Sequence, residues 1–159
     1  GERLAWAANP KGTYIVRTAW LYSPWGKNFV KTMARIALDE SRKVEVVTDQ
    51  VGQPTSAIDL SSQIYKLVDF GLNPGIYHGT NSGQATWFEL AHEVFRLTGE
   101  DVGRLVPIDS RQIHLRAKRP VYSVLSHDDW LTQGMKPMRN WKDALAEILP
   151  TILETIKRG

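Results

Sequence analysis

The stretch 44–60, VEVVTDQVGQPTSAIDL, contains a strand, a polar loop and the start of a helix in direct succession. The β-branched valines within 44–47 predict the strand. Residues 48–55 are polar and include a glycine and a proline, so we expect the chain to turn there. Ser56, with Asp59 three positions later, forms the pattern of a capping box, which predicts that a helix begins at once.

The loop at 48–55 holds polar side chains between a strand and a helix. Loops on such a scaffold commonly bind small polar ligands. Asp49, Gln50, Gln53 and Thr55 supply carboxylate, amide and hydroxyl groups for a ligand of this kind. The same pattern also fits a well-capped connection without a ligand, and the residues alone leave both interpretations open.

Strand-like and helix-like segments alternate along the rest of the chain. Further strands are predicted at 13–17, where successive apolar residues suit a strand buried on both faces, at 76–80, and at the edge of a sheet at 105–108. The predicted helices lie at 1–8, 28–38, from 56 onward, 86–99, 126–134 and from 140 to the end. Caps are expected from Asn28, from Thr86 with Glu89, and from Ser126 with Asp129. The apolar faces expected to point inward are Phe29, Met33, Ile36 and Ala37 in one helix and Trp87, Ala91, Val94 and Phe95 in another. The alternation of strands and helices predicts an α/β fold. Only about three strands are convincing, fewer than the roughly 5–6 of a typical sheet, so we expect the chain to be part of a larger sheet protein.

Three helical segments carry more specific expectations. Lys27, Lys31 and Arg35 recur at spacing four, which predicts a solvated cationic face, with phosphate contact as the alternative. Pro150 lies inside the last helical pattern and is expected to kink or split that helix. The run GERLAWAA at 1–8 begins without a capping side chain, so we expect it to be the end of a longer element.

The composition excludes several classes of protein. The chain has 159 residues and no cysteine, which excludes disulfides, a thiolate nucleophile and cysteine-ligated metal. Hydrophobic residues make up 42%, but no apolar run approaches the ~18 residues of a membrane span, and no signal-peptide pattern is present. The 20 basic residues are scattered among 17 acidic ones, which is weak evidence for nucleic acid. We therefore expect a cytoplasmic protein that binds neither nucleic acid nor membrane.

The sequence shows no reactive constellation. A glycine-rich turn between strand and helix is absent, and so is the G-x-S-x-G motif. His92 and Glu93 would need a second histidine at position 96 to form a metalloprotease site, and Arg96 stands there. His78 is expected to be a hydrogen-bonded core residue. The residues alone therefore predict a ligand-binding chain without a reactive group.

Two further loops offer groups to a ligand. Residues 19–27 follow the strand at 13–17, and ligands of open α/β sheets lie beyond the carboxyl ends of the strands. Trp20 in this aromatic loop is a candidate for stacking on a base or a sugar. The loop before Pro120 is basic and suits phosphate, with a surface loop free of ligand as the equal alternative. Its basic residues are Arg111, Arg116, Lys118 and Arg119.

Six segments form an ordered set: RTAWLY (17–22), GKNFVKTM (26–33), DQVGQPTSAIDL (49–60), GIYHGTNSG (75–83), TWFELA (86–91) and KRPVYSVL (118–125). In this order they resemble the C-terminal half of the dTDP-4-dehydrorhamnose reductase family, which belongs to the extended short-chain dehydrogenase/reductases. The resemblance covers nearly the whole chain. It implies the C-terminal part of an NAD(P)-binding Rossmann-like protein, with its last parallel strands and a smaller α/β substrate-binding domain.

The resemblance also implies an activity. Members of the family reduce the 4-keto group of dTDP-6-deoxy-L-lyxo-4-hexulose to dTDP-L-rhamnose with NADPH or NADH. Their catalytic Tyr-x-x-x-Lys pair is followed within a few residues by Gly-Glu, which Gly1 and Glu2 resemble. The catalytic pair and the cofactor domain are therefore expected upstream of Gly1, and this chain alone is expected to be inactive. The uncapped run at 1–8 agrees with that expectation.

The resemblance further implies which residues bind the substrate. They are Trp20 beside the sugar and nicotinamide, Asn28 and Phe29 along the diphosphate and base, Gln50, Pro54 and Thr55 in the nucleotide pocket, and Arg119 at the diphosphate. Residues 1–25 and 56–83 would pack with the Rossmann sheet, 26–55 and 84–135 would form a substrate lobe, and 136–159 would form the C-terminal helix.

Family members often form dimers and bind Mg²⁺, so a homodimer and a Mg²⁺ ion are open expectations, although no residue here is assigned as a metal ligand. Two alternatives stay open beside the reductase. One is a non-catalytic regulatory relative, of the type found as the regulatory subunit of methionine adenosyltransferase. The other is a different nucleotide-sugar epimerase or reductase.

Overall fold

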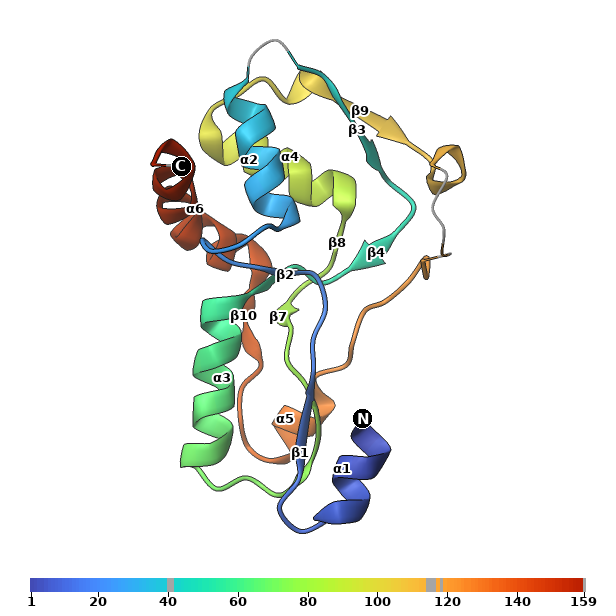
Figure 1. Ribbon diagram of the computed structural model, residues 1–159, viewed down its shortest axis with the longest axis vertical. Coiled ribbons are helices and arrows are strands. Elements are labelled where there is room, and N and C mark those ends of the chain that lie inside the picture. The colour runs from blue at the N-terminus through green and yellow to red at the C-terminus, as the bar shows by residue number, and fades with distance from the viewer. Residues whose placement is uncertain (40–41, 114–116, 118, 159) are drawn as a thin grey trace.

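The computed structural model describes residues 1–39, 42–113, 117 and 119–158. Two lobes are visible along the long axis of the molecule (Figure 1). The upper lobe contains α2, α4 and most of α6, together with β3 and β9, and the lower lobe contains α1, α3, α5 and β1. Among the described residues, no helix is long and apolar enough to cross a membrane.

The helices lie close to their predicted positions. Their bounds are α1 Glu2–Ala8, α2 Phe29–Leu38, α3 Ala57–Asp69, α4 Trp87–Thr98, α5 Asp128–Thr132 and α6 Trp141–Lys157, with short 3₁₀ turns at Val102–Arg104 and Ser110–Gln112. As expected, α1 has no capping side chain, and none of its residues is buried.

The strands form five two-stranded pairs within the described part of the chain. Four pairs are parallel: β1 Tyr14–Arg17 with β6 Gly75–His78, β3 Val44–Val47 with β9 Leu105–Ile108, β2 Leu21–Tyr22 with β5 Thr55–Ser56, and β7 Asn81–Ser82 with β10 Met138–Asn140. The fifth pair, β4 Val51–Gly52 with β8 Ala85–Thr86, is antiparallel. Parallel strands with covering helices confirm the predicted α/β fold. The two- and three-residue strands carry too little pattern to be recognised from sequence.

The upper lobe is built on the packing of α2 against α4, with α6 contacting both helices. Their buried side chains form one hydrophobic cluster, which includes Val30, Ala34, Val94, Phe95 and Leu149. Met33, Ile36 and Ala37 of the predicted inward face of α2 are buried in this cluster, whereas Phe29 is only partly buried. Lys31 is an exception to the predicted solvated face, because its Nζ is buried and donates a hydrogen bond to the carbonyl of Pro24 at 2.8 Å.

The lower lobe has a smaller core around Leu67, Tyr77 and Trp130. Trp130 lies in α5, and its ring packs against Tyr77 of β6 at 4.7 Å. The helix α5 therefore packs against the lower lobe, although its residues fall within the range expected for the substrate lobe. The prediction that the strand at 13–17 is buried on both faces is wrong for this chain. Tyr14 on one face of the β1–β6 pair is 37% exposed, and Ile76 on the other face is 38% exposed, so the described residues do not fully cover either face.

Two predicted helix starts differ from the observed ones. Ser56 caps α3 by accepting a hydrogen bond from the amide of Asp59, but the carboxylate of Asp59 does not return to Ser56. The amide of Ser56 instead donates to Oδ1 of Asn81 at 2.8 Å. In α5 the capping position belongs to His127, and Ser126 bonds to Asp128 rather than to Asp129. By contrast, the capping box that begins α4 is complete and confirms its prediction.

The helix α6 continues through Pro150, so it is not split there, and the alternative expectation of a kink stays a prediction. Proline has no N–H, and the carbonyl of residue 146 therefore loses its helical partner. Ala146 and Pro150 are both exposed, so water can reach that carbonyl. The buried side chains on the opposite face hold the helix together.

Candidate functional site

Two hollows of about 320 Å³ each lie beside one another in the molecule. Both are lined by Gln50, Trp87 and Arg119. The Phe29 hollow is further lined by Phe29, Glu45, Val46, Val47 and Ile113. The Trp20 hollow is further lined by Ala19, Trp20, Pro120 and Ser123. Because three lining residues are shared, the two hollows form one elongated candidate site.

Two stacked indoles form an aromatic wall of this site. The rings of Trp20 and Trp87 lie 3.7 Å apart with an angle of 10° between their planes. Phe29 adds a third ring, 4.7 Å from Trp87 and tilted by 58°. Trp20 is the only non-glycine residue of the described chain with a positive φ, at +47°. A side chain in that region costs about 1–3 kcal/mol and persists only when its surroundings impose it.

Gln50 is the polar group that stands out in the lining. It is only 6% exposed, and its side-chain amide has no hydrogen-bond partner among the described residues. Gln53, three positions later and equally buried, is fully engaged. Its Oε1 accepts from Thr80 Oγ1 at 3.0 Å and from the amide of Leu125 at 2.7 Å, and its Nε2 donates to the carbonyl of Leu125 at 3.2 Å. The Gln50 amide thus faces the two hollows without a protein partner and is available to a ligand.

The residues on either side of Gln50 are hydrogen-bonded to Ser110 and Val121, which lie before and after Arg119 in the chain. Asp49 accepts two hydrogen bonds from Ser110, at 3.0 Å from its amide and 2.6 Å from its hydroxyl. The amide of Val51 donates to the carbonyl of Val121 at 2.8 Å. These bonds tie the chain before and after the basic loop to the strand–loop–helix stretch, and so bring Arg119 to the shared wall of the two hollows.

The basic loop does not act as one cationic cluster in the described structure. Arg111 is exposed and pairs with Asp109 at 2.8 Å. The hydrogen bond from Arg111 lowers the pKa of that carboxyl to about 2. Arg119 is exposed and lines the site, with no ion pair among the described residues. Arg116 and Lys118 lie outside the described residues.

The structure brings together four of the seven substrate-binding residues expected from the sequence: Trp20, Phe29, Gln50 and Arg119. Asn28 lines neither hollow. The oxygen and the nitrogen of its side-chain amide are both hydrogen-bonded to backbone groups of neighbouring residues. Its Oδ1 accepts from the amide of Lys31 at 2.9 Å, and its Nδ2 donates to the carbonyl of Ser23 at 2.7 Å. This arrangement begins α2.

Pro54 and Thr55 are also absent from the lining of both hollows. Thr55 is fully buried, and its hydroxyl donates to the carbonyl of Gln53 at 3.2 Å. Its amide donates to the carbonyl of Trp20 at 3.1 Å. These two residues therefore lie beneath the loop and support it, rather than facing the site.

Trp87 is the lining residue that sequence reasoning missed, because it was grouped with the inward face of its helix. It is the first residue of α4, directly after the capping Thr86. Its ring packs against the hydrophobic core and also lines both hollows. The sequence carried no signal for this second contact, and none for Glu45 or Ile113.

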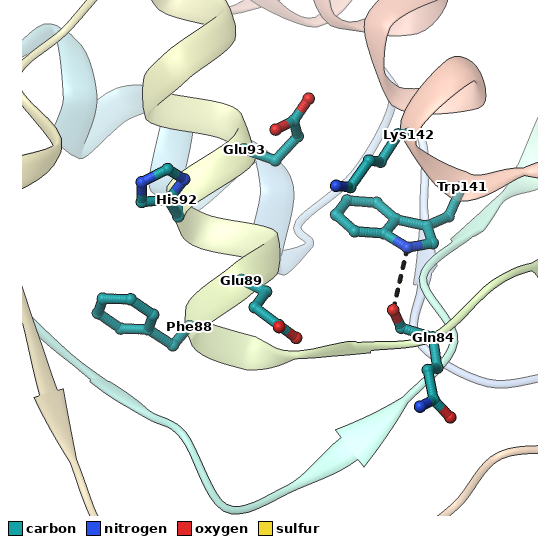
Figure 2. Close-up of a pocket in the computed structure, with 7 residues that line it drawn as sticks. All are labelled: Gln84, Phe88, Glu89, His92, Glu93, Trp141 and Lys142. Carbon is teal, nitrogen blue, oxygen red and sulfur yellow. Dashed lines mark hydrogen bonds between the residues drawn. The ribbon is translucent and has the colours of Figure 1, made fainter.

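A third hollow lies between α4 and α6 (Figure 2). Its polar groups are largely engaged with the protein itself. Glu89 accepts from the amide of Thr86 at 2.7 Å, as part of the capping box. Glu93 is bonded to Arg96, and that bond lowers the pKa of Glu93. Trp141 donates its indole N–H to the carbonyl of Gln84 at 3.2 Å, as the dashed line in Figure 2 shows. This hollow lacks the available buried group that Gln50 supplies to the elongated site.

The elongated site offers several groups to a ligand. Its walls offer ring faces, a free amide and a guanidinium, and such groups suit a ligand with a planar ring and anionic oxygens. Within the described residues, no three histidine, aspartate or glutamate side chains gather as metal ligands.

Comparison with known proteins identifies similar molecules. Residues 1–153 match the model of the family described as RmlD substrate binding domain. The chain is 45% identical over 153 residues to a dTDP-4-keto-6-deoxy-D-glucose reductase of Streptomyces niveus, covering 96% of this chain and 52% of the relative.

Two solved structures are also similar. A dTDP-4-dehydrorhamnose reductase from Clostridium acetobutylicum superposes with a TM-score of 0.86 at 42% identity, covering 94% of this chain and 51% of that one. The enzyme of the same name from Bacillus anthracis, in complex with NADP, gives 0.81 at 36% identity, covering 86% and 48%. The chain spans about half the length of the curated relatives it matches.

Proposed function

This chain belongs to the family of RmlD substrate binding domains, and on that premise we propose that it is the nucleotide-sugar-binding part of a dTDP-4-dehydrorhamnose reductase. The whole enzyme would reduce the 4-keto group of dTDP-6-deoxy-L-lyxo-4-hexulose to dTDP-L-rhamnose with NADPH or NADH. The similarity to reductases at 42–45% identity supports this activity.

The observation that carries the proposal is the unpartnered amide of Gln50. Its amide faces the hollows instead of a protein partner, and a hydrogen bond made there to an uncharged ligand group contributes about 0.5–1.5 kcal/mol. Gln50 lies where the two hollows meet, so a ligand that fills both hollows also satisfies its amide.

The surrounding groups match the parts of a nucleotide sugar. Arg119 offers a planar guanidinium to the diphosphate, for which bidentate hydrogen bonds are typical. The rings of Trp20, Trp87 and Phe29 offer faces to the base and the sugar. The elongated shape of the site suits a ligand in which the diphosphate lies between two rings.

We assign the nicotinamide cofactor and the catalytic Tyr-x-x-x-Lys pair to the part of the enzyme that precedes Gly1. A relative structure contains NADP, which supports NAD(P)H as the hydride donor. This chain's own contribution is to bind and orient the sugar nucleotide. The upper lobe would hold the nucleotide, and the strands and helices of the lower lobe would pack with the cofactor domain. A homodimer remains part of the proposal, without a residue assigned to its interface.

A second candidate is another dTDP-sugar 4-ketoreductase. The relative from Streptomyces niveus carries that kind of name, for a dTDP-4-keto-6-deoxy-D-glucose substrate. The two candidates share the nucleotide, the 4-keto group and the hydride donor, and differ in the configuration of the sugar. Identification of the product sugar from each substrate distinguishes them, and absence of turnover with either substrate would favour a non-catalytic relative.

Binding of the nucleotide part is tested by thermal unfolding of the protein that contains this chain. Thymidine diphosphate at ~100 times its Kd should stabilise the folded state by about 2.7 kcal/mol. Uridine diphosphate, which lacks the thymine methyl group, is the control. A cooperative transition that thymidine diphosphate does not shift would refute a thymidine nucleotide site. Equal shifts with both nucleotides would instead favour another nucleotide-sugar enzyme.

A further inference from the structure

We propose that Gly52 and Trp87 are positioning residues that set the plane of Trp20 in the candidate site. The inference rests on the proposed function, because Trp20 matters only if a ligand fills its hollow. Trp87 holds the ring of Trp20 through the parallel stack at 3.7 Å. Gly52 leaves the space into which that ring fits.

The space at Gly52 is smaller than a methyl group. A Cβ added to Gly52 would lie 2.4 Å from Cε2 of Trp20, and 2.7 and 2.8 Å from Cζ2 and Nε1. Carbon atoms do not approach so closely without displacement, and the indole is a rigid ring. An alanine at position 52 therefore has to move the ring of Trp20 or the strand β4.

The two positioning residues are tied together by backbone pairing. Gly52 lies opposite Ala85 and Val51 lies opposite Thr86 in the β4–β8 pair. Trp87 follows Thr86 directly as the first residue of α4. The hydrogen-bonded strands therefore fix the backbone of Gly52 relative to the backbone that carries Trp87.

Trp20 has a backbone conformation that needs such support. Its φ of +47° lies in a region that L-residues with large side chains rarely adopt. The carbonyl of Trp20 accepts a hydrogen bond from the amide of Thr55, which fixes its backbone. The stack with Trp87 fixes its ring. A strained residue held on several sides is typical of a site in which the side chain must be ready before the ligand arrives.

The experiment is a double-mutant cycle with Gly52→Ala and Trp20→Leu in the protein that contains this chain. Binding of thymidine diphosphate and of the 4-keto sugar nucleotide is measured by calorimetry. Gly75→Ala is the matched control, because a Cβ at Gly75 has its nearest neighbour at an ordinary 3.5 Å. Gly52→Ala and Trp20→Leu should each weaken sugar-nucleotide binding by about threefold to tenfold. The double variant should bind no more weakly than Trp20→Leu alone.

A second measurement reports on the stack without a ligand. The indole N–H signal of Trp20 in nitrogen–proton correlation spectra, assigned from its loss in Trp20→Leu, should carry a ring-current shift from Trp87. Trp87→Leu should abolish that shift, Trp87→Phe should retain part of it, and Gly52→Ala should change it. If Gly52→Ala does not fold, the Trp20 signal in Trp87→Leu and Trp87→Phe still tests whether Trp87 positions the ring of Trp20.

Additive effects of Gly52→Ala and Trp20→Leu on binding would overturn the proposal, and so would a Trp20 signal that is unchanged in Gly52→Ala and Trp87→Leu. A wild-type protein that shows the ring-current pattern but binds no sugar nucleotide would refute the proposed function and leave the positioning of Trp20 in place.

Discussion

Asp59 and Arg139 form a two-point ion pair that joins the first turn of α3 to the strand β10. Nε of Arg139 donates to Oδ2 of Asp59, and Nη2 donates to Oδ1, both at 2.9 Å. Asn81 donates a further hydrogen bond to the same carboxylate at 2.8 Å. Arg139 also contacts Glu147 on α6, so one guanidinium links three elements that are far apart in the sequence.

Replacing Asp59 by asparagine should lower the free energy of unfolding by about 1–2 kcal/mol, since charge-assisted hydrogen bonds are lost but Arg139 is partly screened by water. Urea unfolding measures the change. Asp69→Asn is the control, because Asp69 lies at the exposed end of the same helix and has no ion pair among the described residues. An equal loss in both variants would show that the ion pair contributes nothing particular.

The same pair predicts how stability depends on pH. Burial alone would raise the pKa of Asp59, but hydrogen bonds from Arg139 and Asn81 outweigh burial and hold the pKa below its ordinary 3.8. Because the folded-state pKa is the lower one, the stabilisation is complete above pH 3.8 and is lost as the pH falls through the folded-state value. Urea midpoints measured from neutral pH to about pH 3 should fall less steeply in Asp59→Asn than in the wild type. Parallel curves would contradict the assignment.

Gln50 and Gln53 form a matched pair of buried amides. Gln50→Leu removes an amide without a partner, so the unliganded protein should keep its stability or gain up to about 1 kcal/mol, while binding of the sugar nucleotide weakens by about tenfold or more. Gln53→Leu leaves Thr80 and Leu125 without their buried partner and should destabilise the protein by about 2–3 kcal/mol. Thermal unfolding with and without thymidine diphosphate separates the two effects. Tight binding by Gln50→Leu would remove the main support for the site.

Arg119 and Arg111 provide a second matched pair. Arg119→Ala in the full-length enzyme should raise KM for the sugar nucleotide, because loss of a charged partner of the diphosphate costs about 1.5–3 kcal/mol. Arg111→Ala should leave KM unchanged, since Arg111 faces Asp109 and lines neither hollow. Steady-state kinetics with varied sugar nucleotide gives both values. An unchanged KM in Arg119→Ala would argue against contact with phosphate.

Much of the secondary structure follows from short-range signals in the sequence. The valines of Val44–Val47 form a strand, Asn28 caps α2, and Thr86 with Glu89 forms a complete capping box, all as predicted. These features depend on residues within one turn or one strand of each other, so local propensity and hydrogen bonding decide them. The residues alone offered Trp20, Gln50 and Arg119 as candidates and left interpretations without a ligand open for their loops, whereas Phe29 was identified only through the family resemblance.

The sequence by itself determined the α/β alternation and the helix starts that are capped locally, because each depends on neighbours in the chain. The loop expected over the whole of 48–55 is wrong in part, because Val51–Gly52 and Thr55–Ser56 form the short strands β4 and β5, which pair with distant segments. Only the tertiary structure decided which side chains remain available to a ligand. Gln50 and Gln53 are chemically identical. Gln53 is hydrogen-bonded to Thr80 and Leu125, which come from distant segments, and Gln50 has no such partner among the described residues. The carboxylate of Asp59 likewise accepts hydrogen bonds from Arg139 and not from the amide of Ser56 at the start of its own helix. A buried polar group forms hydrogen bonds with whichever groups the folded chain places next to it. These groups come from distant segments, so the local sequence does not predict them.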